Sequence, residues 1–272
     1  MQDVSDFEGI SRLTKDLREA AKTLTTQEAR FLVDRYYQIQ EDRKRQGNQK
    51  SAALTNSEPN ALVDWMFKNQ HHFENDIRRA LDAYSASVPV GAWSRSIVGI
   101  GPVIAAGLIA HIDIDQAPTV GHIWRFAGLD PTMQWGKGEK RPWNAKLKTL
   151  CWKIGESFVK QKSHKDDTYG KIYDQRKALE SEKNERGEYA KQAEEKLERF
   201  KIGKDTEAYG HYSNGKLPPG HLHARAQRYT VKLFLAHWHH VAYRYAFGSE
   251  PPKPYAIAHL DHAHIMSPPN FS

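Results

Sequence analysis

The stretch of sequence that decides the fold begins at residue 97 and reads Ile97-Val98-Gly99-Ile100-Gly101-Pro102-Val103-Ile104-Ala105-Ala106-Gly107-Leu108-Ile109-Ala110. Two glycines on either side of one apolar residue predict a tight hairpin, and a proline directly afterwards is typical of the first turn of a helix. We interpret the stretch as the end of one helix, a hairpin and the start of a second helix. In such a helix-hairpin-helix unit, the hairpin amides and the helix N-terminus can receive a phosphate. The candidate contacts of this kind are Gly99, Ile100, Gly101 and Val103.

Apolar residues at helical spacing run through most of the chain, and no segment shows the alternation that is typical of a strand. We therefore predict an all-α, multi-helix protein that contains the helix-hairpin-helix unit and carries long charged helices on either side of it. One long helix starts at the N-cap sequence Thr25-Thr26-Gln27-Glu28, carries Phe31 in its apolar stripe and ends at Gly47. A second, highly charged helix covers residues 166–200 and is broken or bent at Gly187.

These elements divide the chain into four expected parts. They are an N-terminal helical region (1–86), a helix-hairpin-helix core (87–165), a long charged helix (166–205) and a histidine-rich helix with a proline-rich tail (206–272). The apolar stripe of the helix at 166–200 is thin, which is typical of an exposed arm or of one strand of an antiparallel helical pair. We therefore expect a homodimer that forms through the long helices.

The composition favours a polyanionic partner in a reducing compartment. The chain of 272 residues has a formal net charge of +7 and a pI near 9.3, and a basic balance promotes association with polyanions. No apolar run approaches the roughly 20 residues of a membrane-spanning helix. Cys151 is the single cysteine, so no internal disulfide can form. With an acidic N-terminus that shows no apolar leader, we expect a cytoplasmic protein.

Cations and tryptophans are concentrated in the middle of the chain. Around the single acid Glu139, the chain places Lys137, Lys140, Arg141, Lys146, Lys148 and Lys153. We expect Trp124 and Trp152 in the core, whereas Trp135 and Trp143 are equally suited to anchoring a loop and to stacking on unpaired bases. The candidate nucleic-acid-binding residues of this region are Lys137, Lys140, Arg141, Trp143, Asn144, Lys146 and Lys148.

The hairpin, the sequence Phe126-Ala127-Gly128-Leu129-Asp130-Pro131 and a helix start at Asn144 form an ordered set. This set resembles the C-terminal transposase domain of the DEDD-type insertion-sequence transposases (the IS-one-ten group), in which a glycine hairpin precedes an Ala-Gly-Leu-x-Pro turn and an Asn-x-x-Leu-Arg helix start. Leu147 and Lys148 stand at the last two positions of that helix start. The resemblance covers residues 94–160 and implies a DNA-binding protein of a mobile genetic element, with branched or structured DNA as the target. Because a structured RNA guides this family, RNA is the alternative partner that the resemblance implies.

Two departures from the family pattern argue against its chemistry. The family carries an N-terminal RuvC-like domain with metal-binding acids, whereas the residues before the hairpin read as helical here and offer no strands for such a site. Where the family has a serine before a glycine, this chain has Trp135-Gly136, and an indole cannot form a phosphoserine-type link. Ser157 is the alternative hydroxyl, but nothing around it in the sequence suggests an activating base. We therefore expect binding without strand transfer and assign no catalytic residue.

The histidine-rich end supplies a further hypothesis from a different class of protein. His237 and His240 are three apart on an expected helix, and Asp261 and His264 can complete a site for zinc or manganese from the tail. Such a site would make the protein a metal-dependent nuclease or recombinase. No His-Glu-x-x-His or paired-cysteine motif occurs, so the sequence implies no cofactor beyond this candidate divalent metal. A structural protein that assembles through its charged helices is the remaining alternative.

Overall fold

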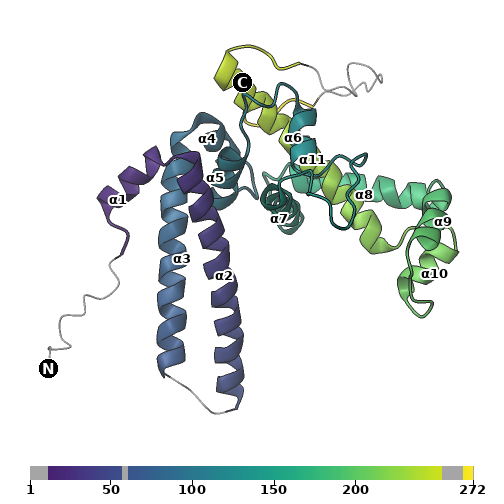
Figure 1. The fold of residues 1–272 in the computed structure, drawn as a ribbon, viewed down its shortest axis with the longest axis horizontal. Helices are drawn as coiled ribbons and strands as arrows, with labels where there is room; N and C mark the ends of the chain where they lie inside the picture. The colour runs from purple at the N-terminus through teal and green to yellow at the C-terminus, as the bar shows by residue number, and fades with distance from the viewer. Residues whose placement is uncertain (1–11, 57–60, 253–265, 272) are drawn as a thin grey trace. The chain divides into compact units, whose positions relative to one another are not determined.

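The computed structural model describes residues 12–56, 61–252 and 266–271, which form eleven α-helices and one short 3-10 helix with no strand among them (Figure 1). The expected all-α class is therefore confirmed. The chain forms two compact units. Unit 1 comprises residues 1–95 and 101–113, and unit 2 comprises residues 96–100 and 114–272. None of the described helices combines the length and the apolar character that a membrane crossing requires.

Unit 1 is built around two long antiparallel helices, α2 and α3, which lie side by side (Figure 1). Its elements are α1 (Lys15–Ala20), η2 (Ala21–Thr23), α2 (Thr26–Thr55), α3 (Ala61–Ser87), α4 (Pro89–Arg95) and α5 (Pro102–His111). The core of the unit forms where one face of α2 meets α3 and α5. The buried side chains there are Ala29, Val33, Tyr36, Ile39, Ile77, Leu81, Tyr84, Val103, Ala106 and Ala110. Long helices with thin apolar stripes thus find a partner within the same chain.

The start of α2 is as the sequence predicts, but its end is not. The hydroxyl of Thr25 accepts a hydrogen bond from the amide of Glu28, and the Glu28 carboxylate accepts one from the amide of Thr25, which completes a capping box. The prediction that the helix ends at Gly47 is wrong, because α2 continues to Thr55. A Cβ added to Gly47 would lie 3.4 Å from the ring of Phe67 on α3. That is an ordinary contact distance, so the position does not require glycine, and the packing of α2 against α3 overrides the weak helix propensity of glycine.

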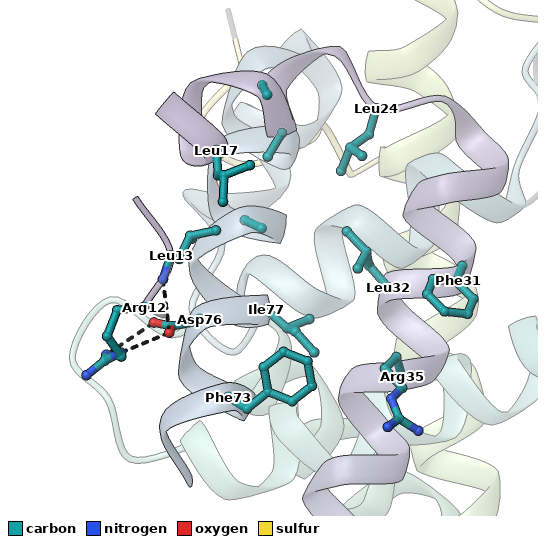
Figure 2. A pocket seen from close by; sticks show the side chains of 13 residues that line it. Arg12, Leu13, Leu17, Leu24, Phe31, Leu32, Arg35, Phe73, Asp76 and Ile77 are labelled. Carbon is teal, nitrogen blue, oxygen red and sulfur yellow. Dashed lines mark hydrogen bonds and ion pairs between the residues drawn. The ribbon is translucent and has the colours of Figure 1, made fainter. Parts of the chain in front are cut away.

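The apolar stripe of α2 also differs from expectation at one residue. Phe31 is 67% exposed, and the buried positions Ala29 and Val33 lie on another face of the helix. Figure 2 shows Phe31 at an apolar pocket of about 520 Å³ that is lined by α1, η2, α2 and α3. At the edge of this pocket, the Arg12 guanidinium donates two hydrogen bonds to the carboxylate of Asp76. Phe31 therefore lines a surface pocket instead of filling the core.

Unit 2 is organised around the longest of its helices, α11, which packs against α6, α7 and α8. Its elements are α6 (Val120–Phe126), α7 (Ala145–Gln161), α8 (Tyr169–Glu185), α9 (Ala190–Arg199), α10 (Glu207–Ser213) and α11 (Pro219–Phe247). Three buried rings form its centre. Phe158 and Tyr169 stack with centroids 4.7 Å apart, and both meet Phe234 edge to face. This cluster fixes α7, α8 and α11 against one another.

The long charged segment of the sequence divides into two helices at Gly187, which confirms the predicted break. Residues 207–213 form α10, because the hydroxyl of Thr206 caps the helix by accepting a hydrogen bond from the amide of Tyr209.

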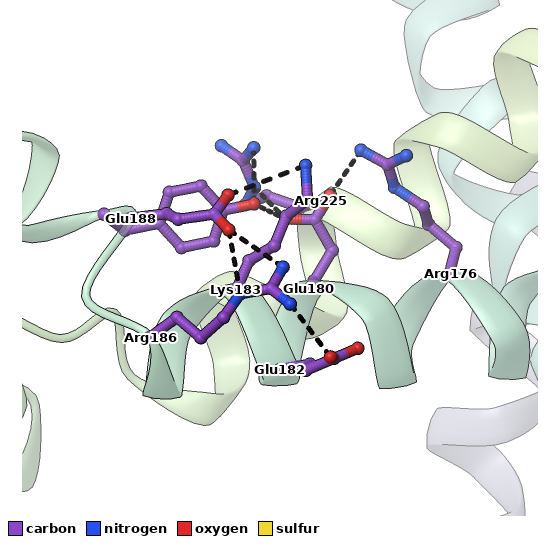
Figure 3. A network of polar contacts seen from close by, with 8 residues as sticks. Arg176, Glu180, Glu182, Lys183, Arg186, Glu188 and Arg225 are labelled. Carbon is purple, nitrogen blue, oxygen red and sulfur yellow. Dashed lines mark hydrogen bonds and ion pairs between the residues drawn. The ribbon is translucent and has the colours of Figure 1, made fainter.

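A buried carboxylate holds three helices of unit 2 together (Figure 3). Glu180 on α8 is 1% exposed and pairs with Arg176 at 2.5 Å and with Arg225 of α11 at 2.6 Å. The hydroxyl of Tyr189, at the start of α9, donates a third contact to the same carboxylate. Burial alone would raise the pKa of the Glu180 carboxyl, but the hydrogen bonds from Tyr189 and Arg225 outweigh burial and hold the pKa below its usual value.

Candidate nucleic-acid interface

The glycine hairpin occupies the segment between the end of α4 at Arg95 and the start of α5 at Pro102. Gly99 has a φ of +94°, and a Cβ added to it would lie 3.1 Å from the Phe158 ring. Its carbonyl oxygen accepts a hydrogen bond of 2.6 Å from the hydroxyl of Ser157. Both the backbone conformation and the contact therefore require glycine at position 99.

The other hairpin candidates differ in how well their backbone and side chains are placed to contact a phosphate. The amide of Ile100 already donates to the carbonyl of Ile97 at 2.9 Å. The side chains of Ile100 and Val103 are buried and serve packing. Gly101 caps α5 in an extended conformation, and a Cβ added there meets no atom within 4 Å. Backbone contact with a phosphate is thus best supplied by Gly101 and the amides in the first turn of α5.

A closed loop connects α6 to α7. The amide of Asn144 donates to the carbonyl of Phe126 at 2.9 Å and joins the two ends of the loop. Gly128 has a φ of +65°, and a Cβ added to it would approach the Trp143 ring to 2.8 Å. The indole of Trp143 therefore lies directly on the backbone of Gly128, which reinforces the closure of the loop beside the Asn144 contact.

Two tryptophans of this loop support two cations. The rings of Trp135 and Trp143 meet edge to face with centroids 6.0 Å apart. The Arg141 guanidinium lies 4.9 Å from the centre of the Trp135 ring, and the Lys148 ammonium lies 4.1 Å from that of Trp143. Each indole face attracts its cation and restricts where the charge can lie. We call residues 135–148 the basic segment.

Within the basic segment, the acid has a structural role. The Glu139 carboxylate accepts a hydrogen bond of 2.8 Å from the amide of Gly136, and the Glu139 carbonyl accepts one of 2.9 Å from the indole of Trp135. No ion pair with a carboxylate of the described residues is formed by Lys137, Lys140, Arg141 or Lys148.

The charge of Lys148 is held in an unfavourable setting. Partial removal from water is the largest cause that lowers the pKa of the Lys148 ammonium. The positive charges of Arg141 and Arg228 lower this pKa further. A phosphate placed among these cations would relieve their mutual repulsion. The basic segment therefore has the electrostatics of an anion-binding surface.

The remaining two candidates of the basic segment lie at the start of α7. The side-chain oxygen of Asn144 accepts hydrogen bonds of 3.0 Å from the amides of Lys146 and Leu147. This cap sets where α7 begins and thereby places Lys146 and Lys148 in its first turns. Asn144 thus positions neighbouring cations.

Sequence reasoning placed Trp152 wrongly and missed Arg228. The core assignment of Trp152 is wrong because its ring is 58% exposed. Trp124 was also expected in the core but is only half-buried, and its indole donates to the carbonyl of Lys232 on α11 at 3.0 Å. Arg225, Arg228 and Lys232 recur at helical spacing on α11, and this basic stripe was the available signal for Arg228.

The histidine candidates have structural partners. Nδ1 of His237 lies 2.6 Å from the Tyr169 hydroxyl, and Nε2 lies 2.8 Å from the carbonyl of Met266. His240 lies 3.3 Å from a carboxylate oxygen of Glu250. Asp261 and His264 are outside the described residues. Among the residues that the structure describes, no group of three or more histidine, cysteine or acidic side chains is arranged to hold a metal ion.

Comparison with known protein families finds a match over the segment that contains the hairpin and most of the basic segment. Residues 94–147 match the model of the Transposase IS116/IS110/IS902 family. The match supports the resemblance drawn from the sequence, in the part that corresponds to a C-terminal transposase domain. Searches of the curated proteins and of the solved structures found no significant match.

Proposed function

We propose that this protein binds nucleic acid, with DNA as its principal partner, and that the basic segment supplies the main contacts. One observation carries the proposal. The cations Lys137, Lys140 and Arg141 are exposed and have no carboxylate partner among the described residues, although ion pairs are frequent elsewhere in the chain. Cations that form no internal pair remain available to neutralise phosphates and release counterions. The match to a transposase family supports a protein that acts on the DNA of a mobile element.

The hairpin is proposed as a second set of backbone contacts. Gly101 is the N-cap of α5 and has no side chain, and a Cβ added there would meet no atom within 4 Å, so its amide and the first-turn amides of α5 are proposed to donate to a phosphate. Contacts of this kind recognise the sugar-phosphate backbone and carry no sequence information by themselves. We therefore expect affinity to depend on the shape and charge of the target.

Binding without strand transfer remains the proposed mode of action. At the position of the family's serine, Trp135 offers an indole that is engaged with Arg141 and Glu139. The alternative hydroxyl, Ser157, donates its proton to the carbonyl of Gly99. In this arrangement neither side chain is prepared to attack a phosphodiester.

The experiment is a salt titration of affinity for a labelled DNA duplex, between about 50 and 200 mM salt, because the slope reports the number of phosphates neutralised. The triple variant Lys137→Gln, Lys140→Gln, Arg141→Gln should flatten the slope of log K against log salt by roughly 2 to 3. A matched triple variant on exposed lysines outside the basic segment removes the same charge: Lys191→Gln, Lys201→Gln, Lys204→Gln. Equal slopes for the two variants would refute a role for the basic segment.

Side-by-side titrations with duplex DNA, branched DNA and structured RNA identify the preferred partner. We expect DNA to bind more tightly than RNA of equal charge. For the hairpin, Gly101→Val should weaken binding with little loss of helix content by circular dichroism, since a Cβ at this position meets no atom within 4 Å. Tighter binding of the structured RNA would make the protein an RNA-binding module instead.

A further inference from the structure

A pocket of about 360 Å³ lies between α7 and α11, beside the basic segment. Its volume falls within the range of roughly 300–1,000 Å³ that is usual for sites of small ligands. The side chains that matter for its chemistry are Lys148, Trp152, Glu156, His223, Gln227 and Arg228. We call it the α7–α11 pocket.

The two cations of this pocket have no acidic partner. Among the described residues, neither Lys148 nor Arg228 forms an ion pair with a carboxylate. Partial removal from water, followed by the nearby charge of Arg225, lowers the pKa of Arg228. The two cations therefore define an end of the pocket that suits an anion such as a phosphate.

The pocket also contains a chain of hydrogen-bonding groups. The amide of Gln227 donates to Oε1 of Glu156 at 2.8 Å, and Nε2 of His223 lies 3.9 Å from the same oxygen. Nδ1 of His223 is in turn 2.6 Å from the hydroxyl of Tyr173. These contacts fix the Glu156 carboxylate, while its second oxygen, Oε2, accepts no hydrogen bond from a described residue. An oriented and open carboxylate oxygen suits a ligand that donates an N–H.

An exposed indole completes the pocket. Trp152 lines it with a ring that is 58% exposed, and no hydrogen bond or ring contact within the described part of the chain engages that ring. Nucleobases stack on such rings, and the stacking tolerates any base because every base has a π-face. Cations, an open acceptor and an exposed aromatic face are the groups that recognise a nucleotide.

We infer that the α7–α11 pocket binds one unpaired nucleotide of the bound nucleic acid, with its phosphate at Lys148 and Arg228, its base against Trp152 and an amino group on the base donating to Glu156. The inference rests on the proposed function, because the nucleotide is part of the nucleic acid that the basic segment holds. It adds a preference for targets with an unpaired base, and for cytosine over thymine. Cytosine presents an amino group, whereas thymine presents a carbonyl oxygen at the equivalent position.

The test compares three labelled DNAs that share one duplex: blunt-ended, with a single-stranded overhang of deoxycytidines, and with an overhang of thymidines. The deoxycytidine overhang should raise the affinity about tenfold over the blunt duplex, as expected for one stacked and contacted base. The thymidine overhang should give a smaller gain. Trp152→Ala should abolish the gain and leave blunt-duplex binding at the wild-type level, while Trp152→Phe should keep most of the gain. Arg228→Gln should also abolish the gain, measured as the ratio of overhang to blunt-duplex affinity and compared with that ratio in the charge-matched control Lys204→Gln.

Glu156→Gln tests the contact with the base edge. Its amide oxygen would continue to accept from Gln227, so its amide N–H groups would face the pocket and favour the carbonyl of thymine. We expect the preference to move from deoxycytidine to thymidine in this variant, and an unchanged preference would refute the contact.

The outcomes separate the two proposals. If the blunt duplex binds and neither overhang adds affinity, the pocket inference is wrong and the proposed function stands. If the wild-type protein binds none of the three DNAs, the proposed function is wrong and the pocket inference fails with it.

Discussion

Positive side chains are used in opposite ways around Glu180 and in the basic segment, although both belong to unit 2. Arg176 and Arg225 converge on a carboxylate that is 1% exposed, and all three side chains are held between packed helices. In the basic segment, Arg141 and Lys148 lie on tryptophan rings and face no carboxylate of the described chain. The first arrangement neutralises charge within the fold, and the second leaves it available.

We expect the paired cations around Glu180 to affect stability and the unpaired cations of the basic segment to affect ligand binding. A buried ion pair that loses one partner leaves an uncompensated charge in a low-dielectric interior, so it affects folding strongly. An exposed cation on an aromatic ring contributes only a little to stability. Charges that do not stabilise the fold and repel one another are better explained by a ligand than by packing.

The largest effect is expected where the internal network is interrupted. Glu180→Gln removes the charge that Arg176 and Arg225 share, and we expect it to lower the free energy of unfolding by about 3–5 kcal/mol in a urea titration. Glu182→Gln on the same helix is the matched control, because Glu182 is exposed and, among the described residues, forms an ion pair only with exposed Arg186. That control should lose less than about 1 kcal/mol. Equal losses in the two variants would mean that the network around Glu180 does not hold the helices.

A second effect should follow when the aromatic support of the basic segment is displaced. Gly128→Val places a β-branched residue at a φ of +65° and pushes its Cβ into the Trp143 ring. We expect a loss of about 1–3 kcal/mol in unfolding free energy and weaker DNA binding, because Trp143 no longer supports Lys148. Gly138→Val carries comparable backbone strain at a φ of +88° with no atom within 4 Å. Should both variants bind DNA equally, the position of Trp143 would be irrelevant to binding.

His237 is a buried base that the fold keeps neutral, and low pH should reveal this as a loss of stability. Burial lowers the pKa of His237 from 6.5 to about 4, while its contact with the Met266 carbonyl opposes the shift. The unfolded chain therefore takes up this proton near pH 6.5 and the folded chain only near pH 4, so stability falls as the pH falls through this range. Between pH 7.5 and 5.5 we expect His237 to account for about 1 kcal/mol of lost stability.

Urea titrations at the two pH values measure this loss. His237→Gln should reduce the pH dependence by that amount, because it removes the buried imidazole. If His237→Gln kept the full dependence, the imidazole would not be the group that resists protonation.

Local sequence signals predicted much of the fold. The capping box at Thr25, the break at Gly187 and the proline that starts α5 each depend on residues within one turn of the chain. Gly47 was misread because α2 continues past it while packed against α3, a contact between helices that the local sequence does not show. Phe31 was misplaced for a related reason, since periodicity gives a stripe but does not say which neighbouring helix covers it.

The candidate site was predictable only in part. The cations and tryptophans of the basic segment are visible as a composition, but the pairing of Lys148 with Trp143 requires the loop closed by Asn144. The pocket arises from the packing of α7 against α11. It brings together Trp152 and Arg228, which are more than 70 residues apart in sequence. A single sequence does not specify such a contact, so Trp152 was assigned to the core and Arg228 was not considered.

The smallest effect on folding should come from the basic segment itself, and this is the sharpest distinction from Glu180. Lys140→Gln removes an exposed charge without a described partner, so we expect the free energy of unfolding to change by less than about 0.5 kcal/mol. The same variant should flatten the salt dependence of DNA binding by roughly one unit of slope, as for one lost phosphate contact. Lys204→Gln, an exposed lysine outside the basic segment, should change neither quantity. A stability loss in Lys140→Gln comparable to that of Glu180→Gln would show that this lysine serves the fold, and the separation between internal and available charge would then be wrong.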